Sequence, residues 1–176
     1  MEIRPEAPED WPRIRELTSR AFGQPDEAAL IDALRHEARP FISLVATEHD
    51  ELVGHISFSP VTIGTDSSLD GMGLAPMAVA PEWQRRGIGS QLVRSGLDAC
   101  RQHGVGVVVV LGHPEYYPRF GFVAASRKGL SCEYAVPDEV FMALELTPGA
   151  LRGRSGLVRY HPVFSRFQVE PDDREQ

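Results

Sequence analysis

The N-terminal part of the chain carries apolar residues at helical spacing. Between residues 8 and 22 they fall on one face of a helix: Trp11, Ile14, Leu17, Ala21 and Phe22. The pattern predicts a helix over residues 8–22, preceded by a short strand around Ile3. A second helix is predicted behind Asp26, a good N-cap residue, with a buried side formed by Leu30, Ala33 and Leu34.

The pattern then changes from helical spacing to β-rich runs. Residues 41–63, "FISLVATEHDELVGHISFSPVTI", contain two such runs around the polar turn "EHDE", which is typical of an antiparallel hairpin. Residues 67–73, "SSLDGMG", are predicted to form a loop, and residues 74–79, "LAPMAV", a further strand.

The middle of the chain predicts a crossover between parallel strands. Residues 88–103 carry an apolar stripe formed by Ile88, Leu92, Val93, Leu97 and Cys100. Residues 107–112, "VVVVLG", are apolar throughout, as in a strand covered on both faces. Strand 74–79, helix 88–103 and strand 107–111 therefore form a predicted β-α-β unit.

The rest of the chain predicts shorter elements. "PEYYPRFGF", residues 114–122, reads as a short helix closed by Gly121, and a strand is expected near residues 140–146. From Thr147 on, Pro, Gly and Arg predominate. We expect one domain over residues 1–147 and an appendage over residues 148–176 that packs on or near it, with frayed final residues.

Composition excludes several classes of protein. The net charge of −7 over 176 residues argues against a nucleic-acid binder. No apolar run approaches the roughly 20 residues of a membrane span, and the acidic N-terminus is no secretory signal. Cys100 and Cys132 fit no metal or redox spacing, and the six histidines form no i,i+4 pair, so no metal site is expected. These features favour a reduced, cytoplasmic protein.

Residues 81–93, "PEWQRRGIGSQLV", place two arginines and two glycines just before the predicted helix. Such a turn presents free N–H groups and positive potential to an anion. A nucleotide P-loop needs lysine after its last glycine, but Ser90 follows Gly89. A dinucleotide fingerprint needs a third glycine, where this chain has Leu92. Both designs fail here.

A third design fits. Residues 84–89, "QRRGIG", resemble the Q/R-x-x-G-x-G/A signature of the GNAT acyl-CoA N-acyltransferases. "YYPRFGF", residues 116–122, resembles the aromatic-Tyr-x-x-x-Gly-Phe segment that follows the fifth strand in that superfamily. "LGHPEYYPRFGF" and "GHISFSPVTI" are similar to its YhbS-like bacterial subgroup. The resemblance covers roughly residues 1–147.

The resemblance implies an α/β fold of the α+β type. Its sheet is mixed and mostly antiparallel, with a central parallel β-α-β pair splayed around the cofactor and helices on both faces. The implied cofactor is acetyl-CoA, without a metal, and its implied contacts are Met77, Ala78, Val79, Gln84, Arg85, Arg86, Gly87, Ile88, Gly89 and Ser90. The alternative interpretation of the loop is that Arg85 and Arg86 are ordinary surface residues and Gly87 belongs to an ordinary turn.

Pro76 adds a second indication of the cofactor site. A proline inside a strand usually marks a bulge or an edge. In the GNAT fold the fourth strand is bulged, which implies that main-chain groups of Met77 and Val79 pair with the pantetheine arm of the cofactor. The alternative is that Pro76 only ends a strand.

The resemblance also implies a proton donor. Tyr117 matches the family's tyrosine, whose hydroxyl faces the cofactor sulfur; the alternative is a core aromatic with a satisfied hydroxyl. Tyr116 is expected to serve packing. No base is evident: His113 and Glu115 could act through water. His55 could be catalytic, but a half-buried histidine with satisfied hydrogen bonds is expected. His113 stands where the subgroup usually has Asp.

The predicted function is therefore acetyl transfer from acetyl-CoA to a primary amine of a small molecule or a protein N-terminus, by direct attack in a ternary complex. A non-catalytic acyl-CoA-binding or sensing module is the alternative. The acceptor pocket is built from variable parts of the fold, so the amine stays unidentified. Homodimer formation is left open.

Overall fold

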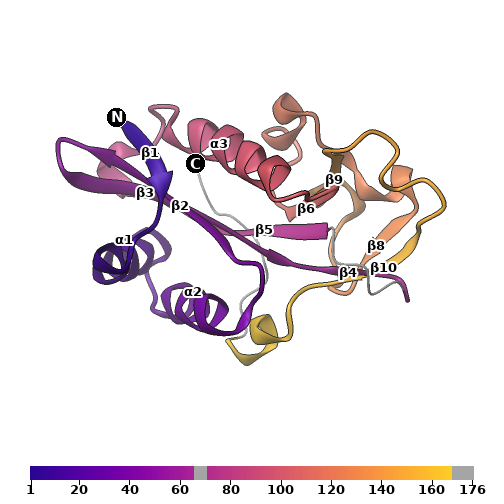
Figure 1. Ribbon diagram of the computed structural model, residues 1–176, viewed down its shortest axis with the longest axis horizontal. Helices are drawn as coiled ribbons and strands as arrows, with labels where there is room; N and C mark the ends of the chain where they lie inside the picture. Colours follow the sequence, from indigo (N-terminus) through magenta and orange to yellow (C-terminus); the bar gives the residue numbers. More distant parts are fainter. Residues whose placement is uncertain (66–70, 168–176) are drawn as a thin grey trace.

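A mixed sheet forms the centre of the molecule (Figure 1). Within residues 1–65 and 71–167, which the computed structural model describes, this sheet has seven strands in the order β1-β2-β3-β5-β6-β9-β7. They span Glu2–Pro5 (β1), Ile42–Glu48 (β2), Glu51–Pro60 (β3), Gly71–Val79 (β5), Val107–Leu111 (β6), Phe141–Glu145 (β9) and Val123–Ala124 (β7). Strands β5 and β6 are parallel, and the other neighbouring described strands are antiparallel. The predicted fold class is confirmed.

Helices cover both faces of this sheet (Figure 1). Helix α3 (Ile88–Gln102) lies on one face, and α1 (Trp11–Phe22) and α2 (Asp26–Glu37) lie on the other. The apolar stripe predicted for α3 is buried in a core cluster with Ile56 and Phe58 of β3. Helix α1 is preceded by a 3-10 turn over Pro8–Asp10. Asp26 is the first residue of α2 and Pro25 is the N-cap, so the N-cap prediction was wrong by one residue.

The hairpin predicted around "EHDE" joins β2 to β3. His49 and Asp50 form its two-residue turn, and both have positive φ angles, 49° and 64°. Two consecutive left-handed residues match the twist of antiparallel strands. Most of the predicted loop at residues 67–73 lies outside the described residues, and Gly71–Gly73 already belong to β5.

Strand β5 carries the bulge that Pro76 predicts. Ile56 pairs with Met77, and Phe58 pairs with Leu74. Ser57 alone therefore faces two residues, Ala75 and Pro76. The Ser57 hydroxyl donates to both of their carbonyl oxygens, at 3.1 and 3.3 Å, so the bulge is held in place by a buried side chain.

Strands β5 and β6 separate after Gly73, just before the bulge in β5. They pair only over Gly71–Gly73 and Val107–Val109. In the described part of the chain, β5 continues to Val79 without a strand on that side, while the end of β6 pairs with β9 alone. We call the space between the diverging strands the opening; Gly73 marks its closed end.

The C-terminal segment builds a second sheet. Over the described residues it has three strands, β4 (Thr62–Ile63), β10 (Gly156–Arg159) and β8 (Leu130–Cys132), with β10 antiparallel to β4 and parallel to β8. Tyr160, which precedes the short helix η6 (Pro162–Arg166), and Phe164, which lies in it, share a core cluster with Leu30 and Leu34 of α2. The described part of the predicted appendage, residues 148–167, thus packs into the same core. The predicted fraying of the final residues lies outside the described residues.

Across residues 1–65 and 71–167, we find no helix with both the length and the apolar character needed to span a membrane.

Candidate functional site

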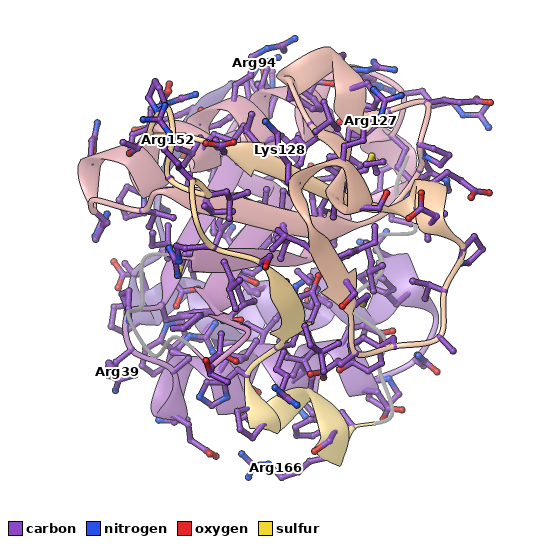
Figure 2. All side chains as sticks on the ribbon, turned by 90° about the vertical axis from the view of Figure 1, so that its right-hand side faces the viewer. Arg39, Arg94, Arg127, Lys128, Arg152 and Arg166 are labelled. Carbon is purple, nitrogen blue, oxygen red and sulfur yellow. The ribbon has the colours of Figure 1, made fainter. Side chains whose placement is uncertain are left out.

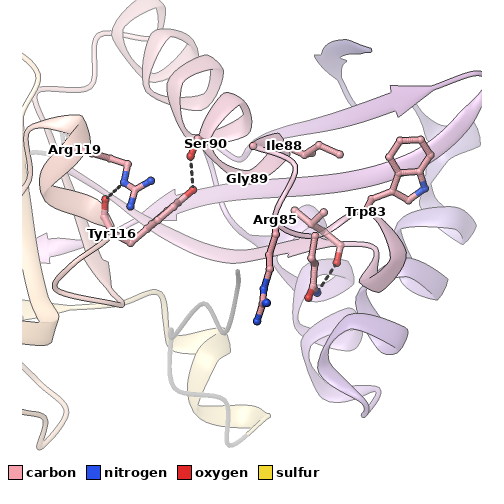
Figure 3. Close-up of a pocket in the computed structure, with 10 residues that line it drawn as sticks. Trp83, Arg85, Ile88, Gly89, Ser90, Tyr116 and Arg119 are labelled. Atoms are coloured by element: carbon pink, nitrogen blue, oxygen red, sulfur yellow. Dashed lines mark hydrogen bonds between the residues drawn. The ribbon is translucent and has the colours of Figure 1, made fainter.

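A cavity of about 210 Å³ lies where β5 ends and α3 begins (Figure 3). Its described lining includes two arginines and no carboxylate: Val79, Trp83, Gln84, Arg85, Gly87, Ile88, Gly89, Ser90, Tyr116 and Arg119. A concave site with this charge balance favours an anionic ligand.

The loop before α3 directs backbone amides into this cavity. Gly87 is the N-cap of α3 and has a φ of 81°, and Arg85 also has a positive φ of 61°. The first helical hydrogen bond runs from the Gln91 amide to the Gly87 carbonyl at 3.1 Å. The amides of residues 87–90 therefore lack helical acceptors, as at any helix N-terminus. A Cβ added to Gly87 would meet nothing within 4 Å, so it is the positive φ and not crowding in the free protein that favours glycine here.

Contacts within the loop fix its position against β5. The Gln84 side chain donates to the Val79 carbonyl at 3.1 Å. The Arg86 guanidinium lies 4.9 Å from the centre of the Trp83 ring, and Arg86 is not among the residues that line the cavity. Gln84 thus joins the loop to the end of β5, while Arg86 braces it from outside.

The structure brings seven of the predicted cofactor contacts to the cavity: Val79, Gln84, Arg85, Gly87, Ile88, Gly89 and Ser90. The side chains of Met77 and Ala78 are buried in the cores on opposite faces of β5. Only their main chain can reach a ligand in the opening. The Val79 carbonyl already accepts a hydrogen bond from Gln84, and its second lone pair is left for an amide of the pantetheine arm.

Tyr116 has a larger part in the site than the sequence suggested. Its hydroxyl lies 3.1 Å from the Ser90 hydroxyl, toward which it points in Figure 3. Arg119 donates from Nε to the Tyr116 carbonyl at 2.9 Å, and its guanidinium covers the Tyr116 ring at 4.5 Å. Tyr116 thus packs against the core, as expected, and also lines the cavity. The sequence analysis did not assign Trp83, Tyr116 or Arg119 to the cofactor site. The spacing of Tyr116 and Arg119 could have linked these two, because residues three apart share a face in a 3-10 helix.

Tyr117 begins the short helix η3 (Tyr117–Phe120) and is fully buried. Its ring packs against Tyr116 and Phe122, with ring centres 5.1 and 5.5 Å away. Its hydroxyl oxygen is buried without a hydrogen-bond partner among the described residues. A buried unpaired hydroxyl costs about 1–3 kcal/mol, so Tyr117 differs from a satisfied core tyrosine.

The candidate bases lie away from this cavity. His113 and Glu115 are exposed in the turn between β6 and η3. His55 is fully buried, so the half-buried expectation was wrong; its Nε2 lies 2.8 Å from the Ser43 hydroxyl. Burial lowers the pKa of His55, which keeps it neutral near pH 7. None of the described residues lining the cavity is Asp, Glu or His.

A second cavity, of about 300 Å³, continues along α3 from the first. It is lined by Arg94, Leu97, Asp98, Arg101, Arg119 and Phe120, and it shares Arg119 with the first cavity. The Arg94 guanidinium lies 5.3 Å from the centre of the Phe120 ring. Asp98 is paired with Arg101 at 2.7 Å, which leaves this groove basic. The pair of cavities suits a long ligand with several phosphates.

Among residues 1–65 and 71–167, no cluster of three or more His, Cys, Asp or Glu side chains is arranged to hold a metal ion.

Comparison with known proteins identifies the class. Residues 2–125 match the family model described as an acetyltransferase (GNAT) domain. The chain therefore belongs to the GNAT acetyltransferase family, as its loop motif and splayed strands led us to expect.

Individual relatives agree with this placement. The chain is 39% identical over 168 residues to the uncharacterized N-acetyltransferase YhbS of Escherichia coli K12, covering 95% of this chain and all of that protein (100%). Its fold matches that of a GNAT family N-acetyltransferase, YhbS from Escherichia coli in complex with CoA, with a TM-score of 0.89 and 37% identity over 97% of this chain and 94% of that one. It also matches a GNAT family acetyltransferase from Brucella melitensis in complex with acetyl-CoA, with a TM-score of 0.77 and 37% identity over 93% and 97% of the two chains. Both structures hold the type of cofactor that the sequence predicts.

Proposed function

We propose that this protein transfers an acetyl group from acetyl-CoA to a primary amine of a small molecule or a protein N-terminus, by direct attack in a ternary complex. The observation that carries the proposal is the opening between β5 and β6, with the basic cavity of the α3 N-terminus at its outer end. The opening leaves part of the β5 edge unpaired by β6, so a cofactor arm can lie there.

The residues present fit coenzyme A in three parts. The amides of residues 87–90, with Arg85 and Arg119 beside them, would hold the pyrophosphate. Arg94 and the Phe120 ring would receive the nucleotide end in the adjoining groove. The free edge of β5 beyond Gly73 would pair with the amides of the pantetheine arm, as an added strand does.

The chemistry then needs one proton donor. The amine nitrogen bonds to the acetyl carbon, the carbon–sulfur bond breaks, and the thiolate takes up a proton. Tyr117 supplies that proton from its hydroxyl, which lacks another partner in the described structure. The nitrogen loses its own proton to water, because the described cavity lining offers no side-chain base.

The lack of a base favours acceptors of modest basicity. An amine with a pKa near 8 is neutral in about one molecule in ten at pH 7, whereas a lysine-like amine is neutral in about one in 2,500. We therefore expect the enzyme to prefer α-amines or other weakly basic amines. The same lack favours the second candidate, a non-catalytic acyl-CoA-binding module, which would bind acetyl-CoA but acetylate no amine.

Two adjacent tyrosines provide the test. Tyr117→Phe should lower turnover by roughly 10²-fold and leave the Kd of acetyl-CoA nearly unchanged, because the lost proton matters only as the sulfur departs. Tyr116→Phe should instead weaken acetyl-CoA binding, because it removes the contact with Ser90. Thiol release with an amine library and calorimetric binding measure the two effects.

Unchanged turnover in Tyr117→Phe would refute its role as the acid. A loss of turnover confined to Tyr116→Phe would transfer that role to Tyr116. Binding of acetyl-CoA without turnover on any amine would favour the non-catalytic module.

A further inference from the structure

Strand β3 carries two fully buried serines, Ser57 and Ser59. Because successive side chains of a strand alternate, both hydroxyls lie on the same face of the sheet. The Ser57 hydroxyl donates to the Ala75 and Pro76 carbonyls of the bulge, at 3.1 and 3.3 Å. The Ser59 hydroxyl has no hydrogen-bond partner among the described residues. Of these two serines, therefore, Ser57 is the one that is connected to β5.

Beyond the bulge, alternate residues of β5 face the opening. The amide of Ala80, just after β5, donates to the Val53 carbonyl of β3 at 2.9 Å, so Ala80 faces β3. Neighbouring residues of an antiparallel strand direct their N–H and C=O groups to opposite sides, and residues 77–79 keep an unbroken register with β3. The main-chain groups of Met77 and Val79 therefore face the opening. The contact from Gln84 to the Val79 carbonyl, at 3.1 Å, agrees with this direction.

The peptide unit between Pro76 and Met77 gives the same direction for Met77. Ser57 holds the Pro76 carbonyl on the side of β3. In a planar trans peptide the C=O and N–H groups point in opposite directions, so the Met77 N–H points into the opening. Pro76 has no N–H of its own, and no described strand pairs with β5 on that side beyond Gly73. Met77 therefore supplies the first main-chain donor after the bulge.

The two contacts that hold the bulge join uncharged groups, one hydroxyl and two carbonyls. Ser57 and the bulge residues Ala75 and Pro76 are buried. The cations labelled in Figure 2 are all exposed instead: Arg39, Arg94, Arg127, Lys128, Arg152 and Arg166. We therefore expect salt, which screens interactions between exposed charges, to change the geometry of the bulge little.

We propose that Ser57 is a positioning residue for the acyl donor: by holding the Pro76 carbonyl, its hydroxyl keeps the Met77 N–H in the opening, where this N–H donates to a carbonyl oxygen of bound acyl-CoA. This inference rests on the proposed function, because it assigns a residue to the cofactor site of the same reaction. Ser57 acts through β5, since it is buried and is not among the residues that line the cavity. The carbonyl belongs to an amide of the pantetheine arm or to the thioester.

Selective isotope labelling of methionine makes the Met77 amide observable by NMR. The chain has four methionines, and Met1 has no peptide amide, so three amide signals are expected. Met72 and Met142 lie in strands that are paired on both sides, so they serve as internal controls. Acetyl-CoA should shift the Met77 signal, which Met77→Leu identifies, and slow its exchange with solvent. A response to CoA as well assigns the contact to the pantetheine arm, and a response to acetyl-CoA alone assigns it to the thioester.

Ser57→Ala releases the Pro76 carbonyl and should weaken the response of the Met77 signal to acetyl-CoA. The Kd of acetyl-CoA, measured by calorimetry, should rise roughly two- to tenfold, the scale of one hydrogen bond between neutral groups. Ser59→Ala is the matched control: it removes the same atom from a buried serine on the same face and should leave the Met77 response and the Kd unchanged. If Ser57→Ala does not fold, Ser57→Cys, which keeps a weak donor, should show a reduced Met77 response.

An unchanged Met77 response and an unchanged Kd in the Ser57 variant would overturn the inference, because the bulge would then be held without the hydroxyl. Binding of acetyl-CoA to the unaltered protein without any change in the Met77 signal would also overturn it, while the cofactor part of the proposed function would stand. Failure of the unaltered protein to bind acetyl-CoA would instead refute the proposed function itself.

Discussion

Gly87→Val gives the sharpest test of the phosphate-binding loop, because the chain offers a matched control. Gly87 has a φ of +81° and Gly104, just beyond the other end of α3, has a φ of +75°; a Cβ at either would meet no atom within 4 Å. Valine therefore costs the free protein only the strain of a left-handed residue, about 1–2 kcal/mol at each site. Both variants should lose about 2–8 °C in Tm.

The two variants should differ only when the cofactor is added. At Gly87 the valine side chain enters the cavity that would hold the pyrophosphate. Losing one or two hydrogen bonds to a charged group, at about 1.5–3 kcal/mol each, weakens binding by roughly 10²-fold. Acetyl-CoA at 100 times the normal Kd stabilises the unaltered protein by about 2.7 kcal/mol, or about 5–10 °C. Gly87→Val should keep only about 1 °C of that shift, and Gly104→Val should keep all of it.

Thermal denaturation with and without acetyl-CoA measures both effects. An equal cofactor-induced shift in the two variants would show that the pyrophosphate does not lie against Gly87. Loss of folding in Gly87→Val alone would contradict the calculation of backbone strain.

Two further predictions concern stability. Gly96→Ala should lower Tm, because its Cβ would lie 2.4 Å from the Phe58 ring; overpacking costs about 1–3 kcal/mol, more than the gain of about 1 kcal/mol in helix propensity. Ser95→Ala in the same helix is the control, and a Tm that rises in Gly96→Ala would show that Phe58 yields freely. The free energy of unfolding should also fall on acidification. Burial holds the pKa of His55 below its usual 6.5. Burial alone would raise the pKa of Glu6, but hydrogen bonds with His55, Arg35 and Ser43 outweigh it and hold that pKa at about 2 rather than 4.5. The unfolded chain takes up these protons first, so the His55 contribution is lost below about pH 6.5 and the Glu6 contribution between about pH 4.5 and 2. Urea denaturation at several pH values checks this, and a Glu6→Gln variant whose stability falls as steeply as that of the unaltered protein below pH 4.5 would refute the part assigned to Glu6.

The elements that were predicted correctly are those whose hydrophobic pattern extends over several residues. The hairpin and the β-α-β unit show five or more consecutive residues of consistent period, and their connections are local. Strands β4, β7, β8 and β10 have two to four residues each, and β8 pairs in parallel with the distant β10. Segments this short carry no period, so only tertiary contacts reveal them.

The site shows the same division between local and tertiary information. Gly87 is readable from the sequence because a left-handed N-cap before a helix needs glycine. The placement of Tyr116 beside Ser90 depends on the 3-10 geometry of η3, which the letters "YYPRF" do not distinguish from an α-helix. His55 alternates with apolar residues in β3, and a strand with one solvated face would leave it half-exposed. Helices cover both faces of this sheet, so both sets of side chains are buried.

The distribution of charge explains how a protein of net charge −7 can hold a cofactor with several phosphates. Charges farther than about 8 Å apart are largely screened at physiological ionic strength, so distant carboxylates have little effect on the ligand. Near the α3 N-terminus the unpaired amides and two arginines determine the local potential, and Asp98 in the adjoining groove is already neutralised by Arg101. The opening that begins beyond Gly73 thus adjoins a site suited to an anion, although the chain as a whole is acidic.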